Sequence, residues 1–103
     1  MAYTRFVTFE WDDSKALANL RKHGVSFEEA RRLFTSGVDY LEIFDDSHGG
    51  DEDRFLAVGA VDRGVLCVVF VERDEETIRI LSARRATRRE VELFRRTMRG
   101  ERP

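Results

Sequence analysis

At 103 residues with 42% hydrophobic content, the chain is long enough for one core and too short for two, so we expect a single domain over residues 1–103. No apolar run approaches the roughly 20 residues that span a bilayer, no charged-then-apolar leader opens the chain, and the single cysteine, Cys67, allows no internal disulfide; we therefore expect a soluble, cytoplasmic protein. A net charge of −2 argues at first sight against a nucleic-acid binder, because phosphate contacts need lysine and arginine.

The first third of the chain predicts one strand and two helices. Residues 5–11 are rich in β-forming side chains and indicate a strand. The next segment places apolar side chains on one face and stops at Gly24, which predicts a helix over about residues 13–23. Ser26-Phe27-Glu28-Glu29 has the spacing of a capping box, and the apolar residues after it indicate a second helix that ends near Thr35.

The middle of the chain is rich in strands. We expect four of them, over residues 38–44, 54–61, 65–73 and 77–84. The last three are joined by short turns, which predicts an antiparallel meander. Every position from Val65 to Val71 is apolar, so this strand should be central and covered on both faces.

A last helix follows the strands. Thr87-Arg88-Arg89-Glu90 is a second capping box, and Val91, Phe94 and Met98 then form an apolar stripe. The arginines of this helix fall on another side and should point outward. The expected fold class is therefore α+β, a mainly antiparallel sheet with two N-terminal helices and one C-terminal helix packed on it.

Charge is unevenly distributed along the chain. From Arg79 to the end there are nine arginines and three glutamates, a net charge of +6, whereas residues 1–78 carry −8. The basic segment suits RNA phosphates and equally suits an acidic partner protein, and a merely solvated helix face would have the same composition. Charge alone leaves these three interpretations open.

The residues that could carry chemistry are arginines, carboxylates and one well-placed histidine. Two histidines and one cysteine, without HExxH, CxxC or a glycine-rich phosphate loop, predict no metal site and no cofactor. Arginines and a base are enough for metal-free RNA cleavage, in which the 2′-hydroxyl attacks the adjacent phosphate and cations stabilise the developing charge. Arginine suits that task because its planar fork matches two phosphate oxygens.

Four segments resemble the BrnT family of bacterial toxins. They are Phe9-Glu10-Trp11-Asp12, Asn19-Leu20-Arg21-Lys22-His23-Gly24-Val25-Ser26-Phe27-Glu28-Glu29-Ala30, Asp53-Arg54-Phe55 and Ile78-Arg79-Ile80-Leu81-Ser82-Ala83-Arg84-Arg85-Ala86-Thr87-Arg88-Arg89-Glu90. The resemblance covers roughly residues 6–95. It implies a compact fold similar to RelE-type ribonucleases, an endoribonuclease that needs no metal, and neutralisation by a BrnA-like ribbon-helix-helix antitoxin.

The resemblance also assigns site residues. Arg54 matches the family's acidic-Arg-Phe pattern and is expected to bind phosphate; a surface arginine at a strand end is the alternative. Ser82 and Arg84 match the family's Ser-Ala-Arg stretch, and Arg84 is the strongest candidate. By period-two alternation Ile78, Ile80, Ser82 and Arg84 should share one face of the last strand. A salt bridge to an acidic loop is the competing role for Arg84.

Two residues compete for the role of general base. His23 lies in the family's Lys-His-Gly segment, and an imidazole is a common general base, but a histidine at this position also commonly holds the last carbonyls of a helix. Glu72, at the solvent-exposed end of the central strand, is the alternative. We further expect RNA contacts from Lys22, Arg79, Arg85 and Arg88.

Two other functions remain open. A non-catalytic module could use the arginine face of the last helix only to bind RNA or an acidic protein, and a degenerate family member could keep the partner interaction without cleavage. In the ribonuclease interpretation, the antitoxin should cover the arginine-rich surface and form a hetero-oligomer with the toxin.

Overall fold

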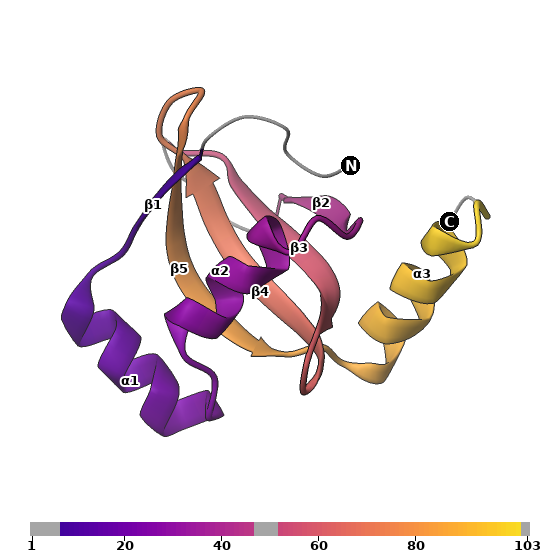
Figure 1. The fold of residues 1–103 in the computed structure, drawn as a ribbon, viewed down its shortest axis with the longest axis horizontal. Coiled ribbons are helices and arrows are strands. Elements are labelled where there is room, and N and C mark those ends of the chain that lie inside the picture. Colours follow the sequence, from indigo (N-terminus) through magenta and orange to yellow (C-terminus); the bar gives the residue numbers. More distant parts are fainter. Residues whose placement is uncertain (1–6, 47–51, 102–103) are drawn as a thin grey trace.

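The structure of the chain is a computed structural model that describes residues 7–46 and 52–101 (Figure 1). Its elements are β1 (Thr8–Glu10), α1 (Asp13–His23), α2 (Phe27–Thr35), β2 (Leu41–Asp45), β3 (Arg54–Val61), β4 (Gly64–Glu72), β5 (Thr77–Arg85) and α3 (Arg88–Met98). All eight expected elements are present. Residues 5–6 of the expected first strand lie outside the described residues, as do residues 47–51, which are acidic and glycine-containing and join the second and third expected strands. In the described ranges, every helix is too short or too polar to cross a bilayer.

The sheet has five strands in the order β1-β5-β4-β3-β2. The expected meander is confirmed, because β3, β4 and β5 pair antiparallel in sequence order and β4 is central. β2 continues the antiparallel pattern beside β3, and β1 pairs in parallel with β5 at the other edge. The fold is therefore the expected α+β class.

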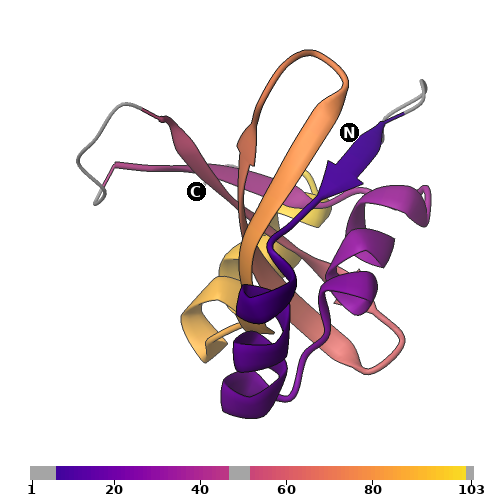
Figure 2. The ribbon, with the colours of Figure 1, turned by 90° about the vertical axis from the view of Figure 1, so that its left-hand side faces the viewer.

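One face of the sheet carries the main core, and we call it the core face. Leu66, Val68 and Phe70 of β4 point to this side and pack with α2, whose Phe34 ring lies 5.1 Å from that of Phe70. At Gly59 a Cβ would come within 2.9 Å of the Cβ of Tyr40, so only glycine lets β3 lie this close to its neighbours. Figure 2 shows α2 on this side of the sheet and α3 on the opposite side.

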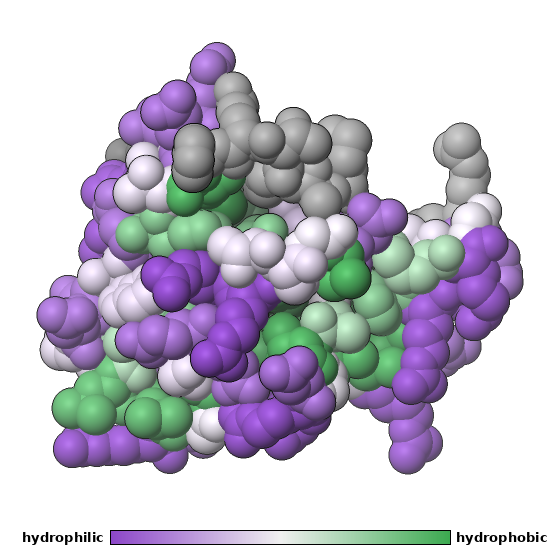
Figure 3. All heavy atoms as spheres, in the orientation of Figure 1, coloured by the Kyte–Doolittle hydropathy of each residue, from purple (hydrophilic) through white to green (hydrophobic). Residues whose placement is uncertain are grey.

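The opposite side, which we call the outer face, is only partly covered. α3 contacts β3 and β2, and none of its residues is fully buried. Its capping box is formed as expected between Thr87 and Glu90. In Figure 3 apolar side chains line the flank of α3 toward the sheet, and hydrophilic side chains cover its outer side. On the outer face, Cys67 and Val71 of β4 are buried, whereas Arg79, Ser82 and Arg84 of β5 are partly exposed.

A bulge in β5 changes which side chains reach the outer face. Val69 pairs with Ser82 while the next residue, Phe70, pairs with Ile80, so Leu81 is an extra residue without a partner in β4. The expected alternation is therefore wrong. Ile78 and Ile80 lie in the core with Ala83, whereas Ser82 and Arg84 point to the outer face.

Candidate active site

The outer face gathers arginines from β3 and β5. Arg84 is the cross-strand partner of Cys67, and Ser82 is the partner of Val69. The side chains of Arg84 and Ser82 therefore point to the outer face, next to those of β4. Arg79 pairs with Val71 one row further on. Arg54 is the first residue of β3 and directly precedes Phe55, whose partner is Phe70, so continuing this antiparallel register by one residue brings Arg54 level with Val71 from the other side. With one strand between them, the backbones of Arg54 and Arg79 are about 10 Å apart.

Arg54 has an unusual environment for an arginine at the start of a strand. Its residue partner in β2 is Asp45, which places a carboxylate beside it. Its Nε is buried and has no hydrogen-bond partner among the described residues. Buried N–H groups are nearly always paired, so an unpaired one marks a position where an acceptor is missing.

Arg79 is held by Glu10 of β1. Its Nη1 lies 2.7 Å from Oε2 of Glu10, and Arg73 approaches the same oxygen at 3.5 Å. The hydrogen bond from Arg79 lowers the pKa of Glu10 below its ordinary value. Arg79 is therefore neutralised by a carboxylate that stays ionised, which makes it a weaker phosphate ligand than its charge suggests.

Arg84 makes a two-pronged ion pair with Glu90 of α3. Nη1 and Nη2 of Arg84 lie 2.8 and 2.9 Å from the two carboxylate oxygens. About a third of the Arg84 side chain is exposed to solvent, at 34%. The predicted competing role, a salt bridge, thus exists, although its partner is on a helix and not in an acidic loop.

Cys67 of β4 is the cross-strand partner of Arg84 in β5. It is fully buried, as expected for a small core residue. Burial raises the pKa of its thiol to about 11. A thiol with that pKa is protonated at neutral pH, so it is inert as a nucleophile. Cys67 serves as packing beneath Arg84.

The other predicted residues lie away from this group. Alternation from Phe70 puts Glu72 on the core-face side, where it lines a hollow of about 390 Å³ together with Glu52 and Asp53. Such an acidic surrounding is unfavourable for phosphate. Lys22 and His23 belong to the last turn of α1, which packs beside β5.

Arg85 and Arg88 do not point from the sheet to the outer face as Arg84 does. Arg85 pairs with Leu66, on the core-face side, and its Nη1 donates to the carbonyl oxygen of Arg63 at 3.3 Å. Arg88 is the first residue of α3 and is exposed. The structure therefore places Arg54, Arg79, Ser82 and Arg84 on the same face of the sheet, and the remaining predicted site residues elsewhere.

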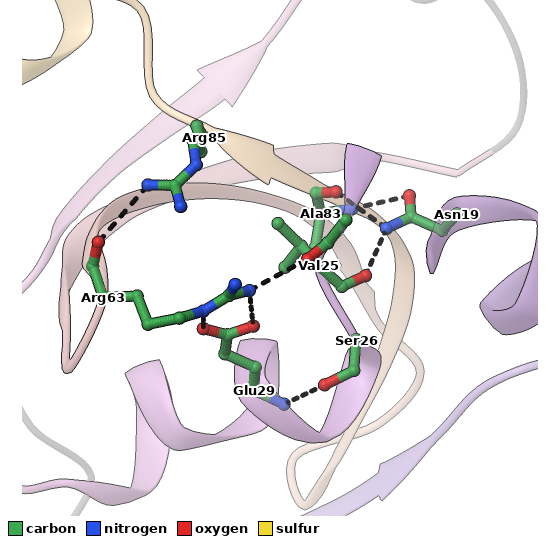
Figure 4. A network of polar contacts seen from close by, with 8 residues as sticks. Asn19, Val25, Ser26, Glu29, Arg63, Ala83 and Arg85 are labelled. Atoms are coloured by element: carbon green, nitrogen blue, oxygen red, sulfur yellow. Dashed lines mark hydrogen bonds and ion pairs between the residues drawn. The ribbon is translucent and has the colours of Figure 1, made fainter. Parts of the chain in front are cut away.

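Asn19 is a buried residue whose role the sequence did not reveal (Figure 4). Its side-chain amide donates to the carbonyls of Val25 and Ala83, at 3.0 and 2.7 Å, and its oxygen accepts from the N–H of Ala83 at 3.1 Å. Ala83 lies beyond the residues of β5 that β1 pairs with. The asparagine amide thus replaces a missing strand at this edge.

Glu29 is also used differently from the expectation (Figure 4). Ser26 caps α2 through the N–H of Glu29, but the Glu29 carboxylate pairs with Arg63 in the β3–β4 turn, so the reciprocal half of the expected capping box is replaced. Nε and Nη2 of Arg63 lie 2.7 and 2.6 Å from the two oxygens. Nη2 also donates to the carbonyl of Gly24, which ties the α1–α2 connection to the hairpin.

The fold and the site together define a small α+β protein with an arginine-lined, half-open sheet face. A model of the BrnT family, described as the ribonuclease toxin of type II toxin-antitoxin systems, matches residues 11–90. The chain belongs to this family of ribonuclease toxins, as its sequence motifs predicted, and an antitoxin is the partner that such a system implies.

One solved structure supports the fold. The crystal structure of the Brucella abortus ribonuclease toxin BrnT is similar to this chain with a TM-score of 0.60 and 24% sequence identity. The match covers 80% of this chain and 99% of that chain. No curated protein matches the sequence. At this level of identity the structural likeness shows the shared fold alone.

Proposed function

We propose that the outer face is the active site of a metal-independent endoribonuclease. The observation that carries this proposal is the placement of Arg54 and Arg84 on the same face of the sheet, which α3 covers only in part. Ser82 lies between them in the sheet and adds a hydroxyl. In the same described ranges, no three histidine, cysteine or acidic side chains gather as ligands for a metal ion.

The proposed reaction uses the RNA's own 2′-hydroxyl. A base removes its proton, the oxygen attacks the adjacent phosphorus, and the bond to the 5′-oxygen of the next nucleotide breaks as that oxygen takes a proton. The products are a 2′,3′-cyclic phosphate and a free 5′-hydroxyl. Arg54 and Arg84 stabilise the extra negative charge on the phosphorane. His23 and Glu72 are the two bases that the sequence suggested, and both lie away from the outer-face arginines, so a role for either requires the RNA to extend beyond this face.

Cleavage in EDTA tests this function. We expect the purified chain to cut an RNA oligonucleotide at an unchanged rate in EDTA, to leave a 2′,3′-cyclic phosphate, and to spare DNA of the same sequence, because DNA has no 2′-hydroxyl. Mass spectrometry of the fragments checks all three results. Cleavage that EDTA abolishes would overturn the metal-free mechanism. In the same assay, the base is whichever of His23→Ala and Glu72→Gln loses cleavage while keeping thermal stability.

The antitoxin is proposed to be a ribbon-helix-helix protein that covers the arginine-rich surface in the cytoplasm and forms a hetero-oligomer with the toxin. Covering the phosphate-binding groups is the simplest way to silence the enzyme, and the net charge of +6 from Arg79 onward suits an acidic partner segment. We expect affinity, measured by calorimetry, to fall as salt rises from 50 to 500 mM. An affinity indifferent to salt would contradict an electrostatic interface.

A second candidate function is a non-catalytic module that binds RNA or protein through α3. The exposed arginines of this helix favour it, since Arg88, Arg95 and Arg99 all lie on the surface. Such a module would need neither Arg54 nor Arg84. The EDTA experiment separates the two functions, because the module would bind RNA and leave it intact.

A further inference from the structure

Arg84 has a specific set of donors left over after its contacts within the chain. Of its five N–H groups, two bind Glu90, one from Nη1 and one from Nη2, and a second on Nη1 donates to the carbonyl of Arg85 at 3.3 Å. The two remaining donors are Nε–H and the second N–H of Nη2. No residue that the structure describes accepts a hydrogen bond from Nε of Arg84. These two donors lie side by side on one edge of the guanidinium.

Another arginine of the chain uses the same Nε–Nη2 edge of its guanidinium to bind a carboxylate. Arg63 uses Nε and Nη2 to hold the two carboxylate oxygens of Glu29, at 2.7 and 2.6 Å (Figure 4). A phosphate presents two oxygens in a similar arrangement, so the edge that Arg84 leaves open has the geometry for one phosphate. Glu90 therefore binds the Nη1–Nη2 end of the Arg84 guanidinium and leaves the Nε–Nη2 edge available for a ligand.

Glu90 is itself fixed in place. Its Oε1 accepts from the N–H of Thr87 at 2.8 Å, and its own N–H donates to the Thr87 hydroxyl at 3.1 Å. The hydrogen bond from Arg84 lowers the pKa of Glu90, so the carboxylate stays ionised at neutral pH. A fixed anion at the start of α3 thus sets the direction of the Arg84 guanidinium, which is otherwise a flexible side chain.

We infer that Glu90 is a positioning residue for RNA cleavage, which holds Arg84 so that its Nε–Nη2 edge faces the scissile phosphate. The inference rests on the proposed ribonuclease function and on the role of Arg84 in it. Glu90 touches no RNA in this arrangement and acts only through Arg84. The ion pair also has an opposite interpretation, in which Glu90 withholds Arg84 from the substrate, and that interpretation predicts faster cleavage when the carboxylate is removed.

The test compares kcat for a short RNA in four proteins: wild type, Glu90→Gln, Arg84→Ala and the double variant. Glutamine keeps the size of the side chain and can still cap α3. We expect Glu90→Gln to lower kcat about 10- to 100-fold, the usual loss when a partner that orients a functional side chain is removed. We expect the double variant to lose no more than Arg84→Ala alone, since a residue that acts through Arg84 has no effect without it.

The control is Glu92→Gln, which makes the same charge change at an exposed position two residues further along α3 and should leave kcat unchanged. Thermal denaturation of each variant separates lost folding from lost positioning. Should Glu90→Gln be poorly folded, Glu90→Asp keeps the charge and retracts it by one methylene, and an intermediate loss of kcat is expected.

Faster cleavage by Glu90→Gln, an unchanged kcat, or losses that multiply in the double variant would each overturn the inference while the ribonuclease function stood. A wild-type chain that cleaves no RNA would instead overturn the proposed function, and the role of Glu90 with it.

Discussion

Arg84→Ala is expected to lower the rate of RNA cleavage by roughly 10²–10³, the usual cost of removing one donor that stabilises charge in a transition state. The arginine is one-third exposed on the outer face, and its Nε–H and one N–H of Nη2 remain after its contacts with Glu90 and Arg85. The loss should appear in kcat more than in KM, because the charge that Arg84 stabilises develops only in the transition state. Single-turnover cleavage of a labelled RNA oligonucleotide measures it.

The control for this experiment is Arg95→Ala. Arg95 is exposed on α3, so its loss should weaken RNA binding modestly and in a salt-dependent way, with little effect on the chemical step. Arg84→Lys adds a second comparison, since lysine keeps the charge but has no planar fork and should recover only part of the rate. Equal effects of Arg84→Ala and Arg95→Ala would mean that Arg84 contributes only charge.

Asn19→Ala should be the most destabilising change of a polar residue in the described chain. It removes three buried hydrogen bonds and leaves the N–H and C=O of Ala83 and the C=O of Val25 without partners. Each buried group left unpaired costs about 1–3 kcal/mol, so we expect a loss of about 3–5 kcal/mol. Domains of this size are stable by only about 5–15 kcal/mol, so the variant should be close to unfolding. Urea denaturation measures the change.

Two further variants serve as comparisons for Asn19→Ala. Asn19→Asp keeps the acceptor for Ala83 but loses both donations, so it should also be strongly destabilised. Lys15→Ala, at an exposed position on the same helix, should stay within about 0.5 kcal/mol of wild type. A loss below 1 kcal/mol in Asn19→Ala would show that water takes over the hydrogen bonds and that the edge of β5 is open to solvent.

The sequence predicted the elements well because their signals are local. Helix caps, turn residues and the unbroken apolar run of β4 act over a few positions, and they were predicted correctly except for the capping box of α2, where Glu29 pairs with Arg63 instead. The parallel pairing of β1 with β5 was not predicted, since it joins Phe9 to Ile78 across most of the chain. The bulge at Leu81 left no signal either, because apolar residues on both sides of it fit simple alternation equally well.

The candidate site was also predicted where its signals are local and missed where its contacts are distant in sequence. Family motifs named Arg54, Ser82 and Arg84, but period-two alternation put Ser82 and Arg84 on the wrong face, because one extra residue reverses every side chain after it. Glu90 was recognised only as a helix cap, and its contact with Arg84 arises from the turn between β5 and α3. Asn19 stood in a quoted motif with no role, because its partner Ala83 is distant in sequence.

The pairing of β1 with β5 also bears on when the protein becomes complete during translation. β1, α1 and α2 are made first, but the strands that they pack against follow much later, and β5 is the last of them. Arg79, Arg84 and Glu90 arrive with that same late segment. A chain that stops before β5 lacks both the partner of β1 and most of the proposed phosphate site, so we expect unfinished copies to cleave no RNA.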